Sequence, residues 1–136
     1  MMIDHIGVVV PDIKQGIKEY ERIGYVGRSP VVDIPHRGIQ VVFLSVFGPC
    51  AGPDIELIQI MKEGVQLPTM HVAFRGIFNS EWNQIDELAC KLIQEGKGSW
   101  EPIPELEVEV LFFTGPGGEL LELVRYKEGG CEQETI

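Results

Sequence analysis

The chain has few basic residues and no long apolar segment. Lysine and arginine together number 11, against 21 aspartates and glutamates, so the formal net charge at pH 7 is -10. Phosphate backbones and anionic lipid headgroups would be repelled by that charge, which argues against nucleic-acid and membrane partners. No apolar run approaches the ~20 residues of a membrane-spanning helix, and the N-terminus shows no basic region followed by an apolar one. We therefore expect a cytoplasmic protein.

Cysteine is also scarce. Cys50, Cys90 and Cys131 are odd in number and widely spaced, and they lack the close spacing of a zinc site, so free thiols in a reducing compartment are expected. With 136 residues, of which 44% are hydrophobic, the chain can form one ordinary domain with its own core. We expect that domain over residues 1–126 and a flexible tail over residues 127–136, where the composition becomes polar and glycine-rich.

Two short apolar runs of strand length each contain one histidine. His5 lies in the first run and is followed two residues later by Gly7, whereas His71 lies in the second run and is followed two residues later by Ala73. Side chains alternate between the two faces of a strand, so each histidine shares its face with a small residue. The two runs are therefore similar in pattern as well as in composition.

The offset of 66 residues between the two histidines also relates Glu56 to Glu122. Acidic residues are common in this chain, so the spacing alone carries little weight. Each glutamate, however, is flanked by aliphatic residues, and each of these runs follows another apolar run, at residues 41–47 and 108–113. The pattern predicts two copies of one supersecondary unit, the first over about residues 1–61 and the second over about residues 69–126.

Each unit is predicted to contain one helix. Asp12 is placed to cap the first helix, with Gln15 as its capping-box partner, and Ser80 is placed to cap the second. Gly24 and Gly96 follow the last apolar positions of the two helices, as glycines at helix C-termini do. We expect loops at 27–38 and 97–104, turns at 48–53 and 114–118, and further strands at 39–47, 54–60, 107–113 and 119–124.

The two glutamates suggest a metal site. A carboxylate within an aliphatic run is costly to bury unless a partner compensates its charge, which applies to both Glu56 and Glu122. Two histidines and two glutamates on paired strands would satisfy one another through a divalent cation. Imidazole and carboxylate together suit zinc, nickel, cobalt, manganese or iron(II), whereas calcium prefers oxygen ligands alone. The alternative is a solvent-exposed sheet face on which each glutamate simply points outward.

These segments resemble the vicinal oxygen chelate superfamily, which includes glyoxalases, bleomycin-resistance proteins, methylmalonyl-CoA epimerases and extradiol dioxygenases. The resemblance covers roughly residues 1–126 and rests on residues 2–12, 55–57, 70–74 and 113–123. It implies an α+β fold of two repeated βαβββ modules whose curved mixed sheets surround a metal-binding cavity. It also implies that the ligands of a divalent cation (cobalt, nickel, zinc or manganese) are His5, Glu56, His71 and Glu122.

The resemblance is greatest to the epimerase and glyoxalase branches. Residues 33–44 resemble the epimerase segment in which an acidic residue precedes a strand, and His36 stands in that place here. Bacterial glyoxalases carry an arginine for glutathione where this chain has Val9, so glutathione is disfavoured. Extradiol dioxygenases use two histidines and one carboxylate, and Glu56 as a fourth ligand would occupy a position that their chemistry leaves open.

The resemblance implies a metal-dependent isomerase, epimerase or lyase that abstracts a proton next to the carbonyl or thioester of a small substrate. Glu122 is the expected base, and His36 is the candidate catalytic residue on the other face of the substrate. One alternative is a glyoxalase-type lyase. Another, from a different class, is a non-catalytic small-molecule-binding protein of the bleomycin-resistance type. We also expect a homodimer, because each module presents a sheet edge that a partner could cover.

Overall fold

The computed structural model of the chain describes residues 1–46, 52–76 and 79–126. The tail predicted at 127–136 lies outside the described residues, as do Cys50, Cys131 and most of the turn predicted at 48–53. Within the described part of the chain, no helix has both the length and the apolar composition needed to cross a membrane.

Strands and helices alternate along the chain in two similar series. The α-helices are α1 (Ile13–Glu21) and α2 (Asn79–Gln94), and the short 3-10 helices are η1 (Pro35–Arg37) and η2 (Pro104–Leu106). The strands are β1 (Met2–Val9), β2 (Val26–Gly27), β3 (Val32–Ile34), β4 (Ile39–Ser45), β5 (Asp54–Ile60), β6 (Met70–Arg75), β7 (Glu101–Ile103), β8 (Val108–Thr114) and β9 (Leu120–Tyr126). The predicted α+β class is confirmed.

The chain divides into two compact units. One contains residues 5–71, and the other contains residues 1–4 together with the chain from Val72 onward. The division runs through β1 and through β6, so each of these strands contributes residues to both units. We call the unit of residues 5–71 the first unit and the other the second unit.

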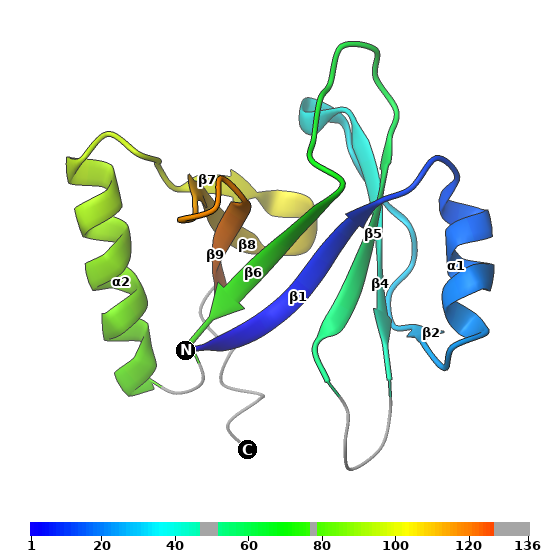
Figure 1. The fold of residues 1–136 in the computed structure, drawn as a ribbon, viewed down its shortest axis with the longest axis horizontal. Coiled ribbons are helices and arrows are strands. Elements are labelled where there is room, and N and C mark those ends of the chain that lie inside the picture. Colours follow the sequence, from blue (N-terminus) through cyan, green and yellow to red (C-terminus); the bar gives the residue numbers. More distant parts are fainter. Residues whose placement is uncertain (47–51, 77–78, 127–136) are drawn as a thin grey trace. The chain divides into compact units, whose positions relative to one another are not determined.

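In the first unit the strands follow the order β2-β4-β5-β1, and β3 also pairs with β4. β1 runs parallel to β5, whereas β4 is antiparallel to β5. α1 lies beside β4 and β5 (Figure 1). Its apolar side packs on the sheet because Ile13 belongs to a buried cluster with Val42, Leu44, Ile55 and Leu57.

In the second unit the strands follow the order β6-β9-β8-β7. β6 runs parallel to β9, and β8 is antiparallel to both β9 and β7. α2 packs against this sheet through a buried cluster of Ile85, Ala89, Leu92, Leu111 and Leu123. Each unit thus repeats the βαβββ pattern expected from the sequence, and β2 is an additional strand in the first unit.

The N-terminus of α1 is capped as predicted. One carboxylate oxygen of Asp12 accepts hydrogen bonds from the backbone N–H groups of Lys14 and Gln15, at 2.9 and 3.3 Å. The Gln15 side chain instead donates to Glu19 Oε1, so it does not close the predicted capping box. Gly24 adopts a positive φ of 100° just after α1, which agrees with its predicted role as the C-terminal stop.

The predicted start of the second helix was wrong by a short distance. α2 begins at Asn79, so Ser80 lies inside the helix and does not precede it. Asn79 and Ser80 are both residues that favour helix N-termini, and sequence alone does not choose between neighbouring residues of this kind. At the other end Gly96 has a φ of 70°, which confirms the predicted stop.

The two predicted loops contain regular structure. Residues 27–38 include β3 and η1, and residues 97–104 include β7 and the start of η2. Both strands have only three residues, which is too short for an alternating pattern to reveal them. Each is followed by a proline that starts the 3-10 turn and then by a left-handed residue, Gly38 in the first unit and Glu107 in the second.

Candidate metal site

A single row of residues crosses the sheet of the first unit. Gly7 on β1 is paired with Glu56 on β5, and Glu56 is paired with Phe43 on β4. Paired residues share a face of the sheet, and so do residues two apart along a strand. His5 therefore lies on the same face as Glu56.

Two histidines of the first unit, His5 and His71, contact the carboxylate of Glu56. His5 Nε2 lies 3.3 Å from Glu56 Oε1, and His71 Nε2 lies 3.8 Å from the same oxygen. The exposed fractions of His5, Glu56 and His71 are 4%, 7% and 8%. The alternative of a solvent-exposed face for these residues is therefore contradicted, because all three side chains are buried and adjacent.

Gly7 provides the space for the His71 side chain. A Cβ atom built at Gly7 would overlap the imidazole ring of His71. The His5 and His71 rings meet edge to face, with centroids 5.6 Å apart and an interplanar angle of 88°. The small residue that shares a face with His5 is thus part of the packing around both imidazoles.

The second unit repeats the same row with Glu122. Glu122 on β9 is paired with Ala73 on β6 and with Phe112 on β8, and its exposed fraction is 4%. Ala73 lies two residues after His71 on β6, on the same face. The neighbouring Phe113 points to the other face and packs against the α2 cluster. Each glutamate is therefore paired with a small residue on one neighbouring strand and with a phenylalanine on the other. The small residues are Gly7 and Ala73, and the phenylalanines are Phe43 and Phe112.

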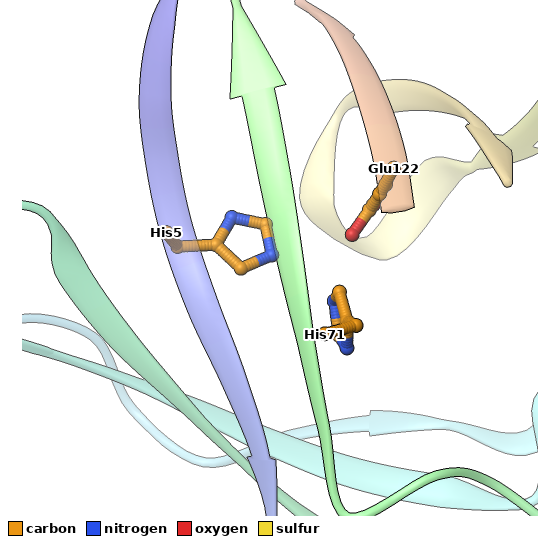
Figure 2. Close-up of side chains that lie close together, drawn as sticks. All are labelled: His5, His71 and Glu122. Carbon is orange, nitrogen blue, oxygen red and sulfur yellow. The ribbon is translucent and has the colours of Figure 1, made fainter. Parts of the chain in front are cut away.

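Figure 2 shows His5, His71 and Glu122, which extend from β1, β6 and β9. Within the first unit, a potential ligand atom of His5 and one of His71 lie within 4.8 Å of each other. Metal–ligand bonds to nitrogen and oxygen are about 2.0–2.2 Å long, so two donors on opposite sides of one ion are about 4 Å apart and adjacent donors are closer. The separations of Glu56 Oε1 from the Nε2 atoms of His5 and His71 fit that requirement. Imidazole nitrogens and carboxylate oxygens also form a suitable ligand set for zinc, nickel, cobalt or manganese.

His36 is not on any of the strands that carry these four residues. It is exposed and lies on η1, three residues before β4 begins at Ile39. Phe43, which is paired with Glu56, lies four residues further along β4, or about 13 Å at the usual rise of a strand. A catalytic role for His36 therefore remains a prediction.

Two residues beside this group were not selected from the sequence. The Phe43 ring meets His5 edge to face with centroids 5.6 Å apart, and the Arg28 guanidinium lies 5.1 Å from the centroid of the Phe43 ring. Phe43 could have been found from the repeat, because Phe112 has the same place beside Glu122. The offset of 66 residues that relates the two histidines does not relate these phenylalanines, because Phe43 precedes Glu56 by 13 residues and Phe112 precedes Glu122 by 10.

No protein-family model matches the sequence. Comparison with curated proteins gives no match either. Solved structures, in contrast, match over nearly the whole chain. The methylmalonyl-CoA epimerase of Mycobacterium tuberculosis is 20% identical with a TM-score of 0.66, and the match covers 92% of this chain and 87% of that one.

Two further structures give the same result. A variant methylmalonyl-CoA epimerase of Streptomyces coelicolor, in complex with 2-nitronate-propionyl-CoA, is 17% identical with a TM-score of 0.67, covering 94% of this chain and 96% of that one. A hypothetical protein from Bacillus halodurans C-125 is 22% identical with a TM-score of 0.62, again covering 94% and 96%. Together with the two repeated βαβββ modules, these matches show that the chain has the fold of the vicinal oxygen chelate superfamily.

Proposed function

We propose that this protein is a metal-dependent isomerase or epimerase that abstracts a proton next to the carbonyl or thioester group of a small substrate. The observation that carries the proposal is the burial of Glu56 between His5 and His71. A buried carboxylate beside two imidazoles is costly unless its charge is compensated, and a shared cation compensates it. The repeat-related Glu122 supplies the fourth ligand of the proposed site.

A divalent cation at this site would act as a Lewis acid and stabilise the negative charge that develops on a carbonyl oxygen during proton removal. His5, Glu56 and His71 hold the cation in this proposal, and their burial keeps water away from it. Cobalt, nickel, zinc and manganese are all compatible with these donors.

Glu122 is the proposed base. Its carboxylate takes the proton from the carbon next to the carbonyl, and the electron pair of the broken C–H bond moves toward the carbonyl oxygen. Return of a proton to the opposite face of that carbon inverts its configuration, and His36 is the proposed donor. Return of the proton to the neighbouring carbon instead gives the glyoxalase-type outcome, which is the alternative reaction on the same site.

The solved structures support a thioester substrate. The similar proteins include methylmalonyl-CoA epimerases in complex with 2-nitronate-propionyl-CoA and with methylmalonyl-CoA. The reaction proposed here needs only the acidic C–H bond next to the carbonyl, which both a CoA thioester and a smaller carbonyl compound provide. A CoA thioester is the first substrate to test.

The test is an assay of the protein loaded with cobalt, nickel, zinc or manganese on two substrates. Epimerisation of methylmalonyl-CoA supports the leading proposal, and isomerisation of the methylglyoxal hemithioacetal supports the alternative. Inactivity on both substrates with every metal would contradict both proposed activities.

A second proposal from another class is a non-catalytic binding protein of the bleomycin-resistance type. Its support is the net charge of -10, which would attract a cationic compound. Elemental analysis of protein purified without chelator separates the two proposals. Protein that contains no metal and takes up neither nickel, cobalt nor zinc would favour the binding function.

We further propose that the protein is a homodimer. β2 and β7 end the strand orders of their units, so each exposes a strand edge with backbone groups that another chain could bind. Light scattering coupled to size exclusion would measure the mass. A monomer of 15.2 kDa at micromolar concentration would contradict this proposal.

A further inference from the structure

Arg28 extends the row of residues that leads to the candidate metal site. Its backbone N–H donates to the carbonyl oxygen of Phe43 at 2.8 Å, which continues the pairing of β2 with β4. The guanidinium lies over the Phe43 ring, 5.1 Å from its centroid, and the Phe43 ring meets His5 edge to face. The Arg28 guanidinium thus contacts the Phe43 ring, and the Phe43 ring in turn contacts His5, a proposed metal ligand.

A carboxylate holds the Arg28 side chain from one side. Arg28 Nε lies 2.7 Å from Asp54 Oδ2, and the other oxygen of Asp54 accepts a hydrogen bond from Ser45 Oγ at 2.6 Å. This pairing occupies Nε and fixes the plane of the guanidinium. Within the described part of the chain, the two terminal nitrogens of Arg28 form no hydrogen bond or ion pair.

A purely structural role explains this arrangement poorly. The Arg28 side chain is 48% exposed, and half-exposed ion pairs contribute little to stability. Arginine is also well suited to bind a planar carboxylate, because its terminal N–H groups form two parallel hydrogen bonds. The protein has a net charge of -10, so the positive charge of the Arg28 side chain beside the buried site is a local exception. This charge would attract an anion.

We propose that Arg28 is a specificity-determining residue that binds a carboxylate group of the substrate. The inference rests on the proposed function, because it assumes that the reacting carbonyl binds beside His5. It narrows the substrate to compounds that carry a carboxylate near the reacting group. Phe43 separates the two binding points and sets the distance between them.

The test compares two ligands of the same size. Malonamate and malonamide differ only in that the carboxylate of malonamate is replaced by an uncharged amide. Their dissociation constants are measured by calorimetry on the parent protein, on Arg28→Met and on the matched control Arg22→Met. Arg22 is also an arginine of the first unit, its side chain is 76% exposed, and it pairs with Glu19, so the control removes the same charge away from the site.

We expect the parent and Arg22→Met to bind malonamate more tightly than malonamide, and Arg28→Met to lose about tenfold in malonamate affinity with little change for malonamide. Equal losses in the two variants would show a general charge effect and overturn the proposal. A parent protein that does not distinguish the ligands, or an Arg28→Met variant that keeps the preference, would also overturn it. Arg28→Lys, which retains the charge without the two parallel donors, should show an intermediate preference and serves if Arg28→Met does not fold.

The measurement is made with and without one equivalent of nickel. Nickel affinity itself should be the same in the parent and in Arg28→Met, because Arg28 is not a ligand. Failure to bind nickel would contradict the proposed function, whereas the preference of the metal-free protein for malonamate over malonamide would still test Arg28. The two failures are therefore distinguishable.

Discussion

Gly7 and His71 are complementary in shape, because the imidazole of His71 occupies the space that a Cβ atom at Gly7 would need. The two residues belong to different strands, β1 and β6. Gly7 is also paired with Glu56, the carboxylate that both histidines contact. The position of His71 relative to Glu56 therefore depends on the absence of a side chain at Gly7.

Replacing Gly7 with alanine should move His71 away from Glu56 and weaken metal binding. Misplaced metal ligands typically cost 10- to 100-fold in affinity, so we expect a loss of at least about tenfold for nickel. Competition titration against a coloured chelator measures the affinity. Gly27→Ala is the matched control, because a Cβ atom there meets nothing within 4 Å, and it should bind nickel as the parent does.

Replacing Glu122 with glutamine should abolish proton transfer. The amide is nearly the same size as the carboxylate but cannot accept the proton, and positioned acid–base groups typically contribute about 100- to 10,000-fold to the rate. Mass spectrometry of methylmalonyl-CoA incubated with metal-loaded protein in deuterium oxide measures exchange of the α-proton. Glu87→Gln, at an exposed position of α2, should retain the parent rate. Undiminished exchange in Glu122→Gln would exclude Glu122 as the base.

Metal should stabilise the folded protein more at pH 7.5 than at pH 5. Imidazole and carboxylate ligands bind a cation only when deprotonated, so protons compete with the metal as the pH falls. A cation that binds only the native state adds about 2.7 kcal/mol at a free concentration of 100 times its Kd. Thermal melts of stripped and reloaded protein at both pH values measure the effect. His71→Ala should show a much smaller gain, and an equal gain would mean that His71 is not a ligand.

Replacing Asp12 with alanine should destabilise the first unit without changing the metal site. The substitution removes the acceptor for two backbone N–H groups at the start of α1, and loss of such a cap typically costs about 1 kcal/mol. Urea denaturation measures the change in the free energy of unfolding. Asp12→Asn keeps an acceptor at the same place and should restore most of the loss, which a general effect of charge would not allow.

The burial of both glutamates could be predicted because aliphatic residues flank each of them and because the histidines share the same offset. The pairing of each glutamate with a phenylalanine could not, since the connection between the two strands has a different length in each unit. Which of two adjacent phenylalanines shares the face of Glu122 also required the observed register, which selects Phe112 over Phe113.

Arg28 could not be predicted from the sequence for a different reason. It lies just after a strand of two residues, where neither hydrophobic alternation nor a motif marks it. Its importance comes from its contacts with Phe43 and Asp54, which are close only after β2 has paired with β4. The short strands β3 and β7 were missed on similar grounds, because their identity depends on pairing with a neighbour.

The most direct test of the proposed site is a nickel titration of stripped protein and of four alanine variants, at His5, Glu56, His71 and Glu122. Isothermal calorimetry gives both the stoichiometry and the affinity. The account predicts one cation per chain in the parent and an affinity at least about tenfold lower in every variant, because each loses a ligand. A stoichiometry far from one, or any variant with the parent's affinity, would contradict a single site built from these four residues.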